Sequence, residues 1–68
     1  MGWTDRYPVG TEVGVTFTDE IGDMTYATAT VANNDGEQLL LWYAGHSLEV
    51  ATEERARELA LRLKSEEG

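Results

Sequence analysis

Apolar residues alternate with polar or small ones from residue 11 to residue 18, where Val13, Val15 and Phe17 share one face of an extended chain. This period of two is typical of a strand with one buried face. The preceding residues mix aromatic, charged and proline residues without any period. We therefore predict an irregular lead-in over 1–10, followed by the first strand.

A second extended run follows at 24–32, after the polar and glycine residues of 19–23. It is rich in threonine, which favours an extended backbone. One of its faces carries Ala27, Ala29 and Val31, whose side chains are small and permit close packing. The pattern predicts a second strand that is antiparallel to the first.

The stretch 33–36 reads Asn-Asn-Asp-Gly, and these residue types tolerate the positive φ angles of tight hairpin turns. A third strand is predicted over 37–44. Its apolar run from Leu39 to Tyr43 suggests a strand buried on both faces, so we expect it to be the central element.

After a turn at 45–47, Leu48 and Val50 predict a short fourth strand that completes a meander. Thr52 is a suitable N-cap for a helix over 52–65, and acidic residues occupy its first turn. Leu61 falls among the charged positions of this helix. The apolar face has the spacing i, i+3, i+4, i+7 and consists of Ala56, Leu59, Ala60 and Leu63.

The elements define an α+β fold in which a small bent antiparallel sheet or SH3-like barrel of four or five strands (11–50) precedes one C-terminal amphipathic helix (52–65). A chain of 68 residues has room for a single domain, 1–68, with one core. Without cysteine, its stability comes from packing or self-association.

Charge narrows the range of partners. Thirteen acidic and five basic residues give a net charge of −8, which repels phosphate backbones and anionic lipids. We expect no direct binding to nucleic acid and no membrane association. The charge suits a basic protein partner, although solubility is its commonest cause. No stretch reaches the roughly 18 apolar residues of a membrane span, and the N-terminal residues lack the pattern of a signal peptide, so a cytoplasmic location is expected.

Three segments together carry a family resemblance: 7–13, 26–31 and 41–50. A glycine before the first strand, a Tyr-Ala-Thr entry to the second and an aromatic-turn-Glu-Val ending resemble the strand order of Tudor-type SH3-like barrels. The resemblance implies a small interaction module. It also implies a cage in which the rings of Tyr26, Trp42 and Tyr43 hold a cation such as a methylated lysine. Adjacent strand residues face opposite sides, so the alternative is that Trp42 or Tyr43 belongs to the core.

No enzymatic constellation is visible. His46 and Ser47 are adjacent in a predicted turn, and adjacency does not activate a nucleophile. Asp19, Glu20 and Asp23 lack the spacing of a calcium loop and are typical of a solvated turn. We expect a non-enzymatic protein without cofactor or metal.

Two functions of different class follow, with a third behind them. The first is an adaptor-like protein-interaction module, and the second is a structural or self-associating subunit. The third, an acidic inhibitor that mimics nucleic acid, is weakened because basic residues interleave with the acids of the predicted helix. The residues expected to contact a partner are Trp3, Tyr26, Trp42, Tyr43 and Leu61.

Overall fold

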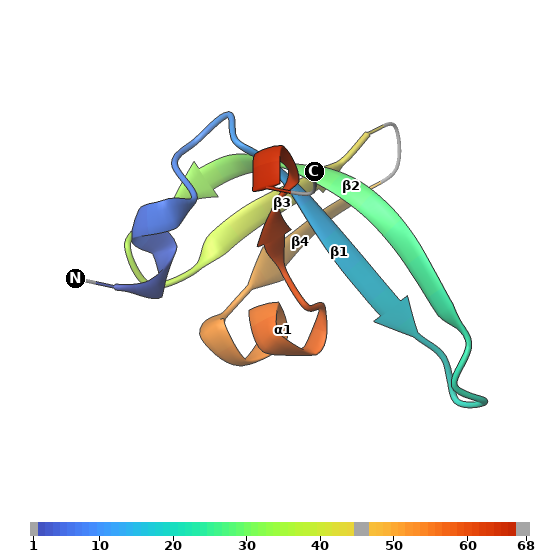
Figure 1. Ribbon diagram of the computed structural model, residues 1–68. Coiled ribbons are helices and arrows are strands. Elements are labelled where there is room, and N and C mark those ends of the chain that lie inside the picture. Colours follow the sequence, from blue (N-terminus) through green and yellow to red (C-terminus); the bar gives the residue numbers. More distant parts are fainter. Residues whose placement is uncertain (1, 45–46, 67–68) are drawn as a thin grey trace.

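The computed structural model describes residues 2–44 and 47–66. Its strands form one antiparallel five-stranded sheet in the order β4-β3-β2-β1-β5 (Figure 1). The first four strands make the predicted meander, and a C-terminal strand joins the sheet beside β1. The strands are β1 (Glu12–Thr18), β2 (Met24–Asn34), β3 (Leu39–Tyr43), β4 (Ser47–Ala51) and β5 (Arg62–Leu63).

The predicted faces of the first hairpin are confirmed. Val13 lies opposite Ala29 and Val15 lies opposite Ala27 across the β1–β2 ladder. Val13 and Val15 are fully buried, and Ala29 is 2% exposed. The small alanines of β2 allow β1 and the core beneath it to pack closely, as their size predicts.

Strand β2 is long and bent, and it crosses the whole sheet (Figure 1). Its pairing with β3 begins only at Thr30, which lies opposite Trp42, and shifts register between Val31 and Asn33. Such a bulge bends a strand and increases its twist. Among the described residues, the preceding part of β2 pairs with β1 alone, so the β1–β2 hairpin projects as an arm. We call residues 24–28 the arm segment.

Strand β3 corrects the prediction of a central strand buried on both faces. Leu39 and Leu41 are fully buried and Tyr43 is 9% exposed, but Trp42 between them is 46% exposed. The apolar run therefore alternates like any strand with one covered face. The middle position of the sheet belongs to β2.

The predicted helix over 52–65 is wrong in length. Helix α1 is Glu53–Glu58, and the Thr52 hydroxyl accepts the Arg55 amide at its start, as expected of the N-cap. Ala60 then adopts a left-handed backbone with φ 51, which ends the helical path. The chain returns through β5 and a short 3-10 helix, η2 (Lys64–Glu66). Leu61 is half-buried and packs against the core.

The lead-in contains a 3-10 helix, η1 (Trp3–Arg6), that the sequence did not predict. Its last part is held by Asn34, whose side-chain amide donates to the carbonyls of Thr4 and Tyr7 at 3.0 and 2.9 Å. The indole nitrogen of Trp3 donates to the Glu37 carbonyl at 3.1 Å. These contacts tie η1 to the β2–β3 turn.

The sheet is curved but does not close into a barrel, since no ladder joins β4 to β5 within the described residues. The core fills its concave side, where α1 also packs through Ala56 and Leu59. Within the same residues, no helix combines the length and the apolar character that crossing a membrane requires. The core cluster consists of Tyr7, Val13, Val15, Ala29, Val31, Leu39, Leu41, Tyr43, Ala51 and Leu59.

Candidate functional site

The residues expected to contact a partner lie in different places. Tyr26 and Trp42 are on the outer, convex face of the sheet, 65% and 46% exposed, whereas Tyr43 points into the concave side. Trp3 is half-buried in η1, with its ring 6.2 Å from that of Tyr7. Leu61 packs against the core. The rings of Tyr26, Trp42 and Tyr43 therefore do not converge on one point.

Strands β3 and β4 place four apolar side chains side by side on the outer face. Trp42 lies opposite Leu48, and Leu40 lies opposite Val50. Leu48 and Val50 are 58% and 52% exposed, and Leu40 is half-buried. Side chains opposite each other in an antiparallel pair are in contact distance. We call Leu40, Trp42, Leu48 and Val50 the outer apolar patch.

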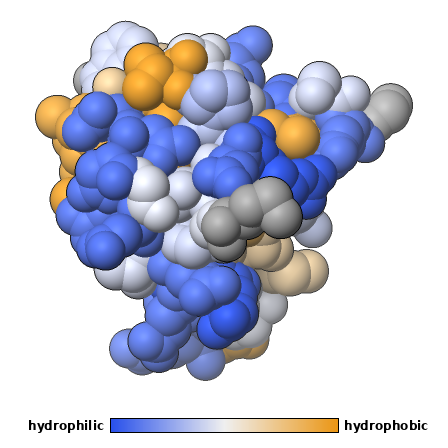
Figure 2. Space-filling model, turned by 90° about the vertical axis from the view of Figure 1, so that its left-hand side faces the viewer, coloured by the Kyte–Doolittle hydropathy of each residue, from blue (hydrophilic) through white to orange (hydrophobic). Residues whose placement is uncertain are grey.

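The patch reaches the edge of the sheet. Strand β4 is the last strand in the order, so its far side carries backbone groups that no described strand pairs. Among the described strand residues that face outward, Glu12 is the one acidic residue. The side of the molecule seen in Figure 2, by contrast, is mostly hydrophilic, with hydrophobic residues gathered at its margins. Within the described strands, carboxylates are thus largely kept off the outer face.

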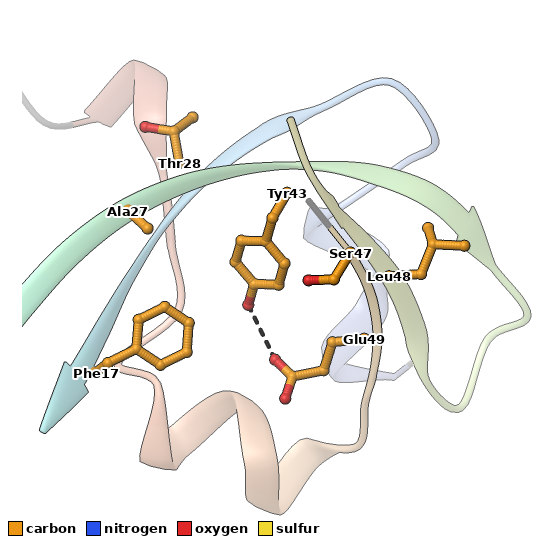
Figure 3. A pocket seen from close by; sticks show the side chains of 7 residues that line it. All are labelled: Phe17, Ala27, Thr28, Tyr43, Ser47, Leu48 and Glu49. Carbon is orange, nitrogen blue, oxygen red and sulfur yellow. Dashed lines mark hydrogen bonds between the residues drawn. The ribbon is translucent and has the colours of Figure 1, made fainter. Parts of the chain in front are cut away.

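A pocket of about 460 Å³ opens on the concave side, at the point where β3 ends (Figure 3). The rings of Phe17 and Tyr43 lie 5.8 Å apart and form an aromatic wall. Glu49 faces them from β4, and Leu48 points away from them toward the outer side. The lining residues are Phe17, Ala27, Thr28, Tyr43, Ser47, Leu48 and Glu49.

The Tyr43 and Glu49 side chains of this pocket are already hydrogen-bonded. The Tyr43 hydroxyl donates to Glu49 Oε1 at 2.9 Å, and Arg55 binds Glu49 Oε2 through Nε and Nη2 at 3.1 and 3.0 Å. Burial, the bond to Glu49 and the carboxylate's charge raise the pKa of Tyr43 well above its usual value. The Glu49 carboxylate is paired with Arg55, so the pocket offers an apolar and hydrogen-bonded surface.

The acidic residues at the tip of the arm form a turn. Asp19 Oδ1 accepts the amides of Ile21 and Asp23 at 3.1 and 2.9 Å, which is the bonding of an Asx-type turn. Within the described residues, no group of acidic or histidine side chains is arranged to hold a metal ion. His46 lies outside the residues that the structure describes.

Sequence reasoning missed the pocket and three of the four patch residues. Leu40, Leu48 and Val50 look like ordinary strand residues, and only the register shows that Leu40 and Val50 flank the Trp42–Leu48 pair on the same face. Comparisons with models of protein families, with curated proteins and with solved structures found no match for this chain. The outer apolar patch and the Phe17–Tyr43 pocket are therefore the candidate sites of function.

Proposed function

We propose that this protein is a non-enzymatic, adaptor-like protein-interaction module that binds its partner through the outer apolar patch. The observation that carries the proposal is the exposed Trp42–Leu48 pair beside the open edge of β4. A tryptophan held on a rigid strand supplies a large contact area at low entropic cost, and such residues dominate the energy of many interfaces. Contiguous exposed apolar surface on a monomer is a typical sign of a contact surface.

The chemistry of the partner follows from the charge distribution. An apolar centre on the partner would cover Trp42 and Leu48, while basic residues at its periphery would be attracted by the net charge of −8 that the chain carries as a whole. The curved five-stranded sheet is compatible with the SH3-like resemblance of the sequence, and small SH3-like folds serve as binding modules. The resemblance supports the class of function and not the identity of the partner.

The test compares capture of partner proteins by the immobilised chain and by Trp42→Thr. Threonine is a good strand residue, so the sheet should be retained while the aromatic surface is removed. Val9→Thr is the matched control, because Val9 is 62% exposed and lies outside the sheet. We expect Trp42→Thr alone to lose the captured proteins. Equal capture by the three chains would contradict the proposal.

A self-associating subunit is the second candidate, and the open edge of β4 is the observation that favours it. Two copies could pair their β4 edges around a two-fold axis and bring the two outer patches side by side. Light scattering behind a sizing column separates the two functions. A mass of two chains that reverts to one chain in Trp42→Thr supports the subunit, whereas a monomer at all concentrations supports the adaptor.

A further inference from the structure

We propose that the arm segment of β2 binds an extended peptide as an added strand, with one apolar side chain of the peptide in the Phe17–Tyr43 pocket. The partner is a peptide segment whose C-terminal part is basic. The inference rests on the proposed function as a protein-interaction module, but it assigns a second surface that is separate from Trp42. Strand addition gives affinity through main-chain hydrogen bonds and specificity through the pockets for alternate side chains.

The direction of backbone groups along β2 supplies the first argument. The Thr16 amide donates to the Leu59 carbonyl at 2.6 Å, on the side of β1 that faces away from β2. The neighbouring residues Val15 and Phe17 therefore direct their backbone groups toward β2, where Ala27 and Thr25 lie opposite them.

Because these directions alternate, Tyr26 and Thr28 direct their N–H and C=O groups to the other side of β2. On that side the ladder with β3 starts only at Thr30. No described residue pairs with the backbone of the arm segment there. Within the described residues, the arm thus presents a second unpaired strand edge, in addition to the far side of β4.

The pocket lies directly beside this edge. Ala27 and Thr28 of the arm segment form one of its walls, and Phe17, Tyr43 and Glu49 form the others (Figure 3). An added strand would direct alternate side chains to the concave side. The pocket volume of about 460 Å³ lies within the usual range for ligand pockets. The aromatic wall of the pocket suits an aromatic or branched aliphatic side chain.

Charge sets the direction and composition of the peptide. Asp19, Glu20 and Asp23 lie at the tip of the arm, next to the start of β2. A peptide antiparallel to β2 would run toward this tip, so its C-terminal residues would meet the carboxylates. Ile21 at the tip is 83% exposed and offers an apolar contact beside them. Lysine or arginine after the apolar anchor is therefore expected.

The test uses ¹⁵N-labelled protein and a synthetic peptide of about nine residues, a common strand length. The peptide alternates valine and threonine, with one phenylalanine near its middle and two lysines at its C-terminal end. In the free protein, the amides of Tyr26 and Thr28 should exchange with solvent much faster than those of Ala27 and Ala29. Added peptide should protect Tyr26 and Thr28 and shift the signals of Phe17 and Tyr43.

Three controls make the result specific. The same peptide with N-methyl groups on the alternate backbone amides that face β2 cannot form the ladder and should bind at least about tenfold more weakly, since more than one net hydrogen bond is lost. Glutamate in place of the two lysines should also weaken binding. Ala27→Leu narrows the pocket and should reduce binding, while Trp42→Thr should not.

Each other outcome overturns the inference. Equal binding of the N-methylated peptide excludes strand addition. Shifts confined to Trp42, Leu48 and Val50 would leave the proposed function intact and refute the second surface. Protection of Tyr26 and Thr28 in the free protein that increases with protein concentration would identify a second copy of the chain, not a peptide, as the occupant. No response to any peptide at millimolar concentration would refute the arm site alone.

Discussion

The two halves of β2 consist of similar residue types, yet they differ in burial and in the strands that pair with them. In the inner half, 29–34, Ala29 and Val31 are 2% and 1% exposed. The backbone of this half is paired on both sides, toward β1 and toward β3. In the arm segment, Tyr26 and Met24 are 65% and 59% exposed, and β1 is the one described strand that pairs with it. The difference teaches that neighbours, rather than strand propensity, decide which part of this sheet is structural and which part is available for binding.

The largest effect is expected from removing a packing partner of the inner half. Leu41 is fully buried and lies opposite Val31. Leu41→Ala should lower the free energy of unfolding by about 2–5 kcal/mol, because the lost contacts leave a cavity. Leu48→Ala on the exposed face is the matched control and should change it by about 0.5 kcal/mol or less. Urea unfolding followed by circular dichroism measures both, and similar losses would contradict the buried–exposed assignment.

The next effect concerns the end of the inner half. Asn34 donates to the carbonyls of Thr4 and Tyr7 and accepts the Gly36 amide through Oδ1 at 2.9 Å. Asn34→Ala should lower the free energy of unfolding by about 1–3 kcal/mol, since it leaves these partly buried backbone groups without partners. Asn33→Ala, at an exposed neighbouring position, is the control. Equal stability of the two variants would show that η1 docks without the Asn34 bonds.

Tyr43 lies at the boundary between the two halves and predicts a pH effect. Its pKa is raised in the folded chain, so the associated stability is present below the unfolded value of about 10 and is lost as the pH rises above it. Tyr43→Phe should cost about 1 kcal/mol at neutral pH through loss of the bond to Glu49. As the pH rises into the alkaline range, the free energy of unfolding of Tyr43→Phe should therefore fall less steeply than that of the wild type. Parallel alkaline curves from urea titrations would contradict this reading.

The smallest effect is expected on the arm. The guanidinium of Arg62 lies 5.8 Å from the ring centre of Tyr26, an exposed contact that contributes about 0.5–1 kcal/mol at most. Tyr26→Thr should therefore lower the free energy of unfolding by only about 0.5 kcal/mol, because threonine keeps the strand propensity. A loss comparable with that of Leu41→Ala, measured in the same urea titration, would show that the arm is part of the folding core.

Local pattern predicted the meander well. Alternation at Val13, Val15 and Phe17 and the small side chains of Ala27 and Ala29 identify both strands and the faces they bury. The alternation predicts these strands correctly because each strand has one covered face, and a period of two in the sequence is the direct result of that burial. The N-cap at Thr52 was likewise readable, since its hydroxyl accepts a backbone amide only one turn away.

The prediction of a helix over 52–65 was wrong because the helical spacing of its apolar residues has another cause. Leu59 and Leu63 do reach the core, but from a helix end and from β5. The stop is at Ala60, where the sequence has neither glycine nor proline to announce a left-handed backbone. Long-range pairing of β5 with β1 decides this region, and no local period contains that information.

The candidate sites were predictable only in part. The aromatic residues of β3 were singled out, but their separation onto opposite faces gives Trp42 to a surface and Tyr43 to a pocket. The unpaired edge of the arm follows from where β3 stops, which depends on the register shift after Val31. The surface position of Trp42, the pocket at Tyr43 and the edge of the arm arise only when the strands are assembled into a sheet, so the sequence of a single strand does not predict them.

The open edge of β4 has a consequence for how this protein behaves in concentrated solution. At neutral pH the net charge of −8 keeps molecules apart, so exposed strand edges and apolar side chains rarely meet. The isoelectric point is about 4.3, and toward that pH the mutual repulsion disappears while the edge and the outer patch remain. Mild acidification should therefore bring about reversible clustering, and acidity becomes a control over the colloidal state of the protein.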